Sequence, residues 1–272
     1  MKTIPPALRT YPPNMPWAIL QVKNQPFAIA TEDLREMLIM PEVSGVPNTA
    51  GYVRGVINLR GRVIPLIDLR KRMGLPSAAD ETNAFCALLD QREQDHKKWL
   101  NELEASVAER RPFALTSDPH QCAFGKWYDS YRAQNQWVAS LLKKFDAPHK
   151  QIHGVAVEVG KFVARQEFDG ANELIARTRA GVLDEMLKLF VDLRSLVRES
   201  ERETAVVINA GGRTISVSVD LALSIEKFAP DSVQPLPPAV AVSRDGVVRR
   251  GGKLNKTGEV ILIYRDGSAS KR

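Results

Sequence analysis

Three histidines and one cysteine near the middle of the chain are of residue types that bind transition metals. His149 and His153 are four residues apart in a segment with helical periodicity, so both imidazoles leave one helix face and can reach a single ion. His96 and Cys122 precede them, each near an inward position of an expected helix. Zinc accepts both imidazole nitrogen and thiolate sulfur in a tetrahedron. We therefore predict that His96, Cys122, His149 and His153 bind one zinc ion.

The role of such a zinc ion depends on how many protein ligands it has. Four ligands leave no open position for water, which favours a structural or sensory role over hydrolysis. A hydrolase using three histidines, with Cys122 displaced, would need a partner acid or base, and the sequence offers no equivalent of the glutamate in His-Glu-x-x-His. Taken singly, a His-x-x-x-His pair or a buried cysteine is more often an ordinary core feature, so the prediction depends on their convergence. His120 is better placed beside the ligands or at the surface than as a ligand.

Four helices are expected to carry these residues and to form an antiparallel bundle. Their expected starts are Asp90, Asp118 as an N-cap, Asp146 or Ala147, and the residues after Phe168-Asp169-Gly170. Arg111-Pro112 ends the first helix, and the second reaches Phe145 with a break near Gly125. The apolar stripe of the fourth helix is expected to comprise Ile175, Val182, Met186, Leu189, Leu193 and Leu196.

Both ends of the chain are expected to form strands. The strand-like segments are Trp17 to Ala30, Val53 to Leu69 with a turn at Arg60-Gly61, Phe85 to Leu89, and Gly258 to Tyr264. Two further strands, Thr204 to Ile208 and Arg213 to Asp220, are expected on either side of a turn at Gly211-Gly212. A short helix is expected to begin at Thr31 and to bury Leu34, Met37 and Leu38. Cys86 is expected to be a small core residue.

The flanking segments resemble a known family. Gly55-Val56-Ile57-Asn58-Leu59-Arg60-Gly61, followed by Ile64-Pro65-Leu66-Ile67-Asp68-Leu69-Arg70, resembles the CheW family of chemotaxis coupling proteins. The resemblance implies two packed five-stranded β-barrels without an active site, which bridge a chemoreceptor tip and a CheA-type histidine kinase. It also implies that Gly55 and Arg60 lie at the receptor-facing groove. The sequence departs from the family at Ser216, where glycine is common, and in its polar end at residues 265–272.

The middle segment resembles a second family, the chemoreceptor zinc-binding domain, abbreviated CZB. The matching pieces are His96-Lys97-Lys98-Trp99, Cys122-Ala123-Phe124-Gly125-Lys126-Trp127-Tyr128 and His149-Lys150-Gln151-Ile152-His153. That family uses three histidines and one cysteine in this order along the chain. The resemblance implies a four-helix bundle, often dimeric, that senses zinc or oxidants through the zinc-bound thiolate.

Composition narrows the remaining function classes. The 272 residues are 44% hydrophobic and 26% charged, with a net charge of +6, and the short basic clusters lack an aromatic-plus-basic pattern for nucleic acid. No apolar run approaches the ~18 residues that span a bilayer. Residues 1–14 lack the apolar core of a signal peptide, so we expect a cytoplasmic protein. In a reducing compartment its two cysteines are expected to be free or metal-bound.

Together these patterns predict an α+β protein with a discontinuous CheW-like scaffold. The expected divisions are a tail at 1–14, CheW-like segments at 15–89 and 204–268, and a zinc-binding bundle inserted at 90–203. We expect a non-enzymatic adaptor between receptor and kinase, with a possible homodimer through the bundle and no insertion into a membrane. One hypothesis is that zinc keeps Cys122 as a thiolate, which an oxidant such as hypochlorous acid converts to sulfenic acid. The alternative is a scaffold with a purely structural zinc, acting in a pathway other than chemotaxis.

Overall fold

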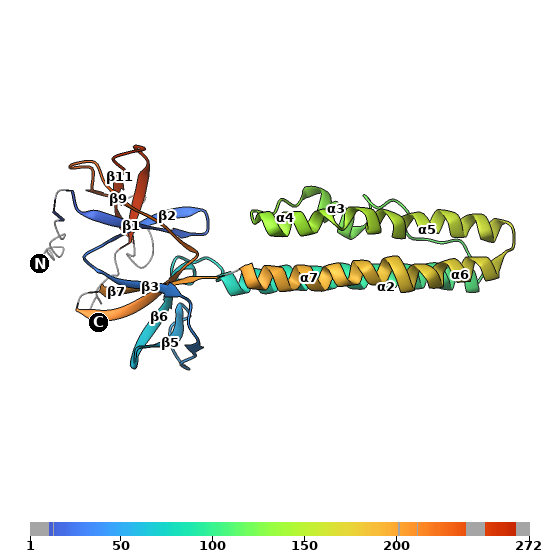
Figure 1. The fold of residues 1–272 in the computed structure, drawn as a ribbon, viewed down its shortest axis with the longest axis horizontal. Helices are drawn as coiled ribbons and strands as arrows, with labels where there is room; N and C mark the ends of the chain where they lie inside the picture. The colour runs from blue at the N-terminus through green and yellow to red at the C-terminus, as the bar shows by residue number, and fades with distance from the viewer. Residues whose placement is uncertain (1–10, 13, 201, 211, 238–247, 265–272) are drawn as a thin grey trace, which may run out of the picture. The chain divides into compact units, whose positions relative to one another are not determined.

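The protein is described here by a computed structural model that places residues 11–12, 14–200, 202–210, 212–237 and 248–264. The chain divides into two compact units (Figure 1). Met1–Ala78 and Arg202–Arg272 form the first, called the β unit, and Ala79–Glu201 form the second, called the helical unit. Both chain ends therefore contribute to one unit, and the middle of the chain forms the other.

Two six-stranded sheets make up the β unit. The first has the strand order β10-β11-β12-β2-β1-β9 and the second β3-β7-β8-β6-β5-β4. Neighbouring strands are antiparallel except for β12 with β2 and β6 with β8. The strands are β1 Pro16–Val22, β2 Gln25–Ala30, β3 Leu34–Ile39, β4 Val43–Ser44, β5 Val53–Leu59, β6 Arg62–Asp68, β7 Thr204–Ala210, β8 Arg213–Val219, β9 Leu221–Lys227, β10 Gln234–Pro235, β11 Val248–Lys253 and β12 Val260–Tyr264.

Residues from both chain ends complete each sheet. Leu34 on β3 pairs with Ile208 on β7, and Phe27 on β2 pairs with Leu262 on β12. Buried side chains form one cluster over the first sheet, around Trp17 and Phe228, and another over the second, around Leu66. A third cluster combines residues of both sheets, so the two sheets share apolar contacts. This interleaving makes the β unit one folding unit despite the long insertion.

The prediction of two five-stranded barrels is correct in its β-rich architecture but wrong in detail. Each sheet has six strands, and among the described strands no pairing closes either sheet into a barrel. The helix expected at Thr31 is also absent, because residues 31–33 form a turn and Leu34–Ile39 form β3. Pairing of β3 with β7 outweighs the local helix signal of Glu32 and Asp33. The other strands expected in the β unit are present, although Gly211 lies outside the described residues.

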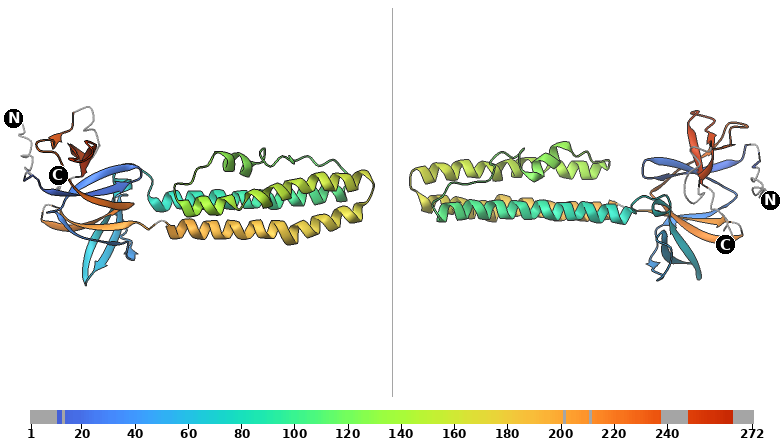
Figure 2. Two further views of the ribbon diagram at one scale, coloured as in Figure 1. Left: turned by 45° about the horizontal axis from the view of Figure 1, so that its top comes forward. Right: turned by 180° about the vertical axis from the view of Figure 1, so that it is seen from behind.

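The helical unit contains α2 Ala78–Ala108, α3 Ala123–Ser130, α4 Gln136–Lys143, α5 Asp146–Ala164 and a continuous rod of α6 Phe168–Thr178, the π-helical turn η1 Arg179–Leu183 and α7 Asp184–Ser200. A further short helix, α1 Leu69–Arg72, follows β6. The long helices α2, α5 and α7 lie lengthwise beside one another (Figures 1 and 2). Their facing side chains form a single buried apolar cluster. Within the described residues, no helix is both long and apolar enough to cross a bilayer.

Two expectations for the helical unit are wrong. Phe85–Leu89, expected as a strand, lies inside α2, where Cys86 and Leu89 are buried at helical spacing. The second helix does not begin at Asp118, because residues 119–121 form a turn and α3 starts at Ala123. It also breaks after Ser130 and not near Gly125, since Tyr131 is extended and Asn135 caps α4. The return path of the bundle is therefore a loop followed by two short helices.

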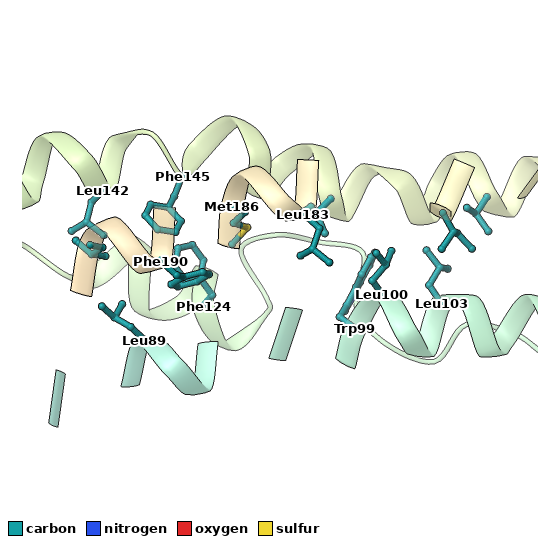
Figure 3. Close-up of a cluster of buried hydrophobic side chains, with 14 of the residues drawn as sticks. Leu89, Trp99, Leu100, Leu103, Phe124, Leu142, Phe145, Leu183, Met186 and Phe190 are labelled. Carbon is teal, nitrogen blue, oxygen red and sulfur yellow. The ribbon is translucent and has the colours of Figure 1, made fainter. Parts of the chain in front are cut away.

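The π-helical turn shifts the buried face of the last helix by one residue. Ile175, Met186 and Leu193 are buried as expected, but Leu183 and Phe190 are fully buried in place of their neighbours Val182 and Leu189. A π turn adds a residue to one turn of an α-helix, so the face rotates beyond it. Phe190 thereby enters the centre of the buried cluster (Figure 3).

Gly55 and Arg60, the predicted receptor-facing residues, occupy special backbone positions in the second sheet. Gly55 has φ 143°, and a Cβ atom there would lie 2.2 Å from the carbonyl oxygen of Ser44. Arg60 has φ 51° in the β5–β6 turn, and its exposed guanidinium donates to Glu36 at 2.8 Å. Gly55 thus sits where only glycine fits, and Arg60 is available at the surface.

We predict that Gly55→Ala lowers the free energy of unfolding by about 2 kcal/mol or more, because the new methyl group meets strand β4 at a backbone angle that side chains avoid. Gly51→Ala is the matched control, since a Cβ atom there meets nothing within 4 Å. Its expected change is within about 0.5 kcal/mol. Urea denaturation followed by circular dichroism measures both. Equal stabilities of the two variants would contradict the assigned geometry.

Candidate metal centre

The structure brings the four predicted ligands together inside the helical unit. His96 lies on α2, Cys122 precedes α3, and His149 and His153 lie one turn apart on α5. One ligand atom from each of the four lies within 4.8 Å of the others. Ligands of a tetrahedral zinc ion are about 3.3–3.8 Å apart, as follows from bonds of ~2.0–2.1 Å to nitrogen and ~2.3 Å to sulfur. The cluster is therefore of the right size and composition for zinc.

Hydrogen bonds leave metal-binding atoms of this cluster free. Nδ1 of His96 donates to the carbonyl of Arg92 at 2.7 Å, which leaves Nε2 with its lone pair. Nε2 of His96 and Nε2 of His153 are buried without a hydrogen-bond partner among the described residues. Nε2 of His149 lies 3.2 Å from Sγ of Cys122. Buried polar atoms normally have partners, and a shared cation would satisfy all of these at once.

Burial keeps the three imidazoles neutral. It lowers the pKa of His149 to about 3 and that of His153 to about 4, helped in both cases by the neighbouring His96. Burial also lowers the pKa of His96. Neutral imidazole is the form that binds a metal, so all three are ready as ligands near pH 7. Burial raises the pKa of the Cys122 thiol, whereas a cation in the cluster would favour its thiolate.

Cys122 is positioned by the start of α3. Its backbone is extended, as at a helix N-cap, and its sulfur accepts a hydrogen bond from the Gly125 amide at 3.2 Å. The turn before it packs closely on the helix: a Cβ atom at Gly125 would lie 1.8 Å from the carbonyl oxygen of Pro119. The same carbonyl lies 3.3 Å from the Cys122 sulfur. Gly125 thus allows the Pro119 carbonyl to approach α3, and in this arrangement the Cys122 sulfur lies beside His149.

Aromatic rings surround the cluster. Phe124, Phe145 and Phe190 meet with ring centroids 4.9–5.6 Å apart (Figure 3). The Phe124 ring lies 4.8 Å from that of His149, and Trp99 lies 4.8 Å from that of His153. These contacts exclude water from much of the site, which strengthens electrostatic interactions inside it.

His120 lies outside this group, as expected. Its side chain is exposed, and Nδ1 lies 2.9 Å from a carboxylate oxygen of Asp129. Sequence reasoning missed the close packing at Gly125 and the central place of Phe190. Gly125 and Phe124 belong to the family-like segment around Cys122, and that segment is the sequence signal for them. No sequence signal marked Phe190, because its burial depends on η1.

Comparison with known families separates the two kinds of segment. Residues 17–97 match the CheW-like domain, and residues 96–159 match the chemoreceptor zinc-binding domain. The chain therefore carries a CheW-like domain followed by a chemoreceptor zinc-binding domain. The strands of residues 204–264 lie beyond both matches, yet they complete the two sheets begun by the first match.

Curated relatives match the first part of the chain. The chemotaxis protein CheW of Bacillus subtilis (strain 168) is 39% identical over 66 residues, which cover 24% of this chain and 42% of that protein. The chemotaxis protein CheW of Thermotoga maritima is 31% identical over 75 residues, covering 28% and 47%. The chain thus spans less than half the length of the curated relatives it matches. The scaffolding protein TtCheW from Thermoanaerobacter tengcongensis aligns over 93% of this chain and 90% of its own, with 12% identity and a TM-score of 0.44, too low to argue a shared fold.

We predict that Gly125→Ala lowers the free energy of unfolding of the metal-free protein by about 1–3 kcal/mol, because the methyl group must displace the Pro119 carbonyl. Gly160→Ala on α5 is the matched control, since an added Cβ atom meets nothing within 4 Å. Alanine inside a helix should raise stability there by about 0.5–1 kcal/mol. Urea denaturation compares the two variants, and a stabilised Gly125→Ala protein would refute the packing described for the turn.

Proposed function

We propose that His96, Cys122, His149 and His153 bind one zinc ion. The observation that carries this proposal is the convergence of three neutral, buried imidazoles and one thiol within 4.8 Å. The nitrogen and sulfur set suits zinc better than magnesium or calcium, which prefer oxygen. When bound, zinc supplies a positive charge that favours the thiolate form of Cys122. Four protein ligands fill the tetrahedron, so we assign the site a sensory or structural role and no hydrolytic one.

We further propose that the protein is a non-enzymatic adaptor that couples a chemoreceptor tip to a CheA-type histidine kinase in the cytoplasm. The CheW-like match and the relatives named chemotaxis protein CheW support this role. In it, Gly55 and Arg60 contact the receptor. The exposed guanidinium at a hairpin end suits an acidic or polar partner surface. We also propose that the helical unit forms a homodimer, as its resemblance to the zinc-binding family implies.

The chain connections suggest how the metal site influences the scaffold. Residue 203, which follows α7 and precedes β7, is a buried glutamate whose carboxylate pairs with Arg54 on β5. Its backbone carbonyl accepts a hydrogen bond from Met40 at 3.0 Å. We propose that a change in the helical unit reaches β5, the strand that holds Gly55, through the chain that leads to Glu203.

We propose that oxidation of Cys122 is the signal that changes the helical unit. The thiolate sulfur attacks the chlorine of hypochlorous acid and displaces hydroxide, and water then replaces chloride in the resulting sulfenyl chloride. In sum, Cys–S⁻ and HOCl give Cys–SOH and Cl⁻. The resulting sulfenic acid has lost the charge that made the sulfur a good ligand. His96, His149 and His153 would then hold the metal more weakly, and the contacts between α2, α3 and α5 at the site would loosen.

A purely structural zinc is the second candidate. Packing of the cluster against Phe124, Phe145 and Phe190 favours it, because zinc in such a core can contribute on the order of 10 kcal/mol to folding. A scaffold of this kind could act in a pathway other than chemotaxis. The two candidates differ in whether oxidant releases the metal.

For the metal site, we predict about one zinc ion per chain in protein purified without added metal, as expected for a closed four-ligand site. Cys122→Ala and His153→Ala should lose it, because each removes a ligand. His120→Ala and Cys86→Ala are matched controls that remove the same residue types outside the cluster and should retain zinc. Elemental analysis measures the content.

The same preparations separate the two candidates. Release of zinc by a stoichiometric amount of hypochlorous acid, followed with a colorimetric chelator, supports the sensor. Zinc that stays bound while the fold is intact supports the structural role. Wild-type protein without zinc, or full zinc content in Cys122→Ala, would overturn the metal site itself.

For the partner surface, we predict that Arg60→Glu weakens binding to a receptor cytoplasmic fragment about tenfold or more, because it reverses an exposed charge at the proposed contact. The pair with Glu36 is exposed, so stability should change by no more than about 1 kcal/mol. Arg62→Glu, an equally basic and exposed neighbour, is the control. Titration of labelled receptor fragment measures both, and equal affinities would remove Arg60 from the interface.

A further inference from the structure

A pocket of about 370 Å³ opens onto one side of the metal cluster. His96, Cys122 and His153 form part of its wall, whereas His149 does not line it. Lys98, Leu115 and Gln121 are exposed residues of the same wall, so the pocket communicates with solvent. Since one water molecule occupies about 30 Å³ in the liquid, the pocket has room for roughly ten.

We propose that this pocket is the entry site through which small neutral or anionic electrophiles reach Sγ of Cys122. Among the four clustered residues the cysteine is half-buried, whereas the three histidines are buried. The His149 side of the cluster is covered by Phe124, and Phe190 packs against His96 at a centroid distance of 6.3 Å. A solute in the pocket therefore meets Cys122 beside Trp99 and Phe124, while His149 and Phe190 lie outside the pocket wall. The proposal rests on the proposed function only in assigning the pocket a signalling use.

Charge at the pocket favours neutral and negative solutes. Asp95 lines the pocket, but its carboxylate is paired with Arg92 at 2.8 Å. Lys98 is exposed and makes no ion pair within the described part of the chain. Lys98 is thus the unpaired charge among the residues that line the pocket, and it attracts anions at low ionic strength. The Asp118 carboxylate, which acts on His153, opposes this attraction.

The pocket has ample room for small oxidants. Its volume of about 370 Å³ exceeds what hypochlorous acid or a methanethiosulfonate reagent needs. Small oxidants are therefore the physiological reagents that we expect at this sulfur.

The test measures the rate at which Cys122 reacts with methanethiosulfonate reagents in a Cys86→Ala background, which has a single thiol. In this reaction the sulfur displaces methanesulfinate and forms a mixed disulfide, detected by mass spectrometry. Leu115→Trp, which enlarges an exposed side chain of the pocket wall, should slow the reaction about fivefold, since exchange rates follow access to the sulfur. Val157→Trp is the matched control, an exposed aliphatic residue of α5 that does not line the pocket.

Charge provides an independent variant if Leu115→Trp perturbs folding. Lys98→Glu should slow the anionic sulfonatoethyl reagent about threefold and speed the cationic trimethylammonium reagent, with the neutral methyl reagent unchanged. Added salt should remove these differences. Unchanged rates in both pocket variants, or equal slowing by Leu115→Trp and Val157→Trp, would overturn the entry site.

Metal-free and zinc-loaded protein are both measured, so this inference and the proposed function can fail separately. Slowing by Leu115→Trp in metal-free protein supports the entry site even if the wild type binds no zinc. Conversely, normal zinc content with an unchanged reaction rate in Leu115→Trp would overturn the entry site and leave the metal site in place.

Discussion

The burial of three neutral imidazoles beside one thiol is the constraint on which the helical unit depends. Nitrogen atoms without partners are costly inside an apolar core, and the cost of one such atom is about 1–3 kcal/mol. The cluster therefore sets up a strong preference for a cation at its centre. The surrounding rings add apolar stabilisation but also hold the histidines away from water, so the same packing that builds the core prepares the ligands.

Backbone geometry at one glycine determines where the sulfur points. Gly125 lets the Pro119 carbonyl approach α3, and the amide of the same residue donates to Cys122. An N-cap position also places the sulfur at the positive end of α3, which favours an anionic sulfur. The chemistry of Cys122 is thus a property of the turn and of the helix start together, in addition to the histidines.

The sequence predicts which four residues cluster better than it predicts the elements that carry them. Helical spacing places His149 and His153 on one face, and the strands β1, β2, β5 and β6 follow from alternation and turn residues. The pattern predicts the start of α3 too early, because Asp118 and Pro119 have the residue types of a helix start. In the structure the chain turns there, and the Pro119 carbonyl packs against Gly125. The local pattern does not indicate Phe190, because a π turn changes the helical period. The pattern predicts a helix at β3, because the partner strand β7 lies far away in sequence. Local sequence patterns thus predict local structure, and the wrong predictions fall where contacts between distant residues determine the structure.

The joining of both chain ends in the same sheets has a consequence for biosynthesis. β3 and β2 emerge from the ribosome long before their partners β7 and β12, and the whole helical unit is made in between. Contacts of such high sequence separation form slowly, and half-built sheets expose unpaired edges. The helical unit, whose contacts lie within a single stretch of chain, can fold first and bring the two halves of the scaffold within reach of each other. On this order of events, the rate at which the β unit is completed depends on how quickly the helical unit folds.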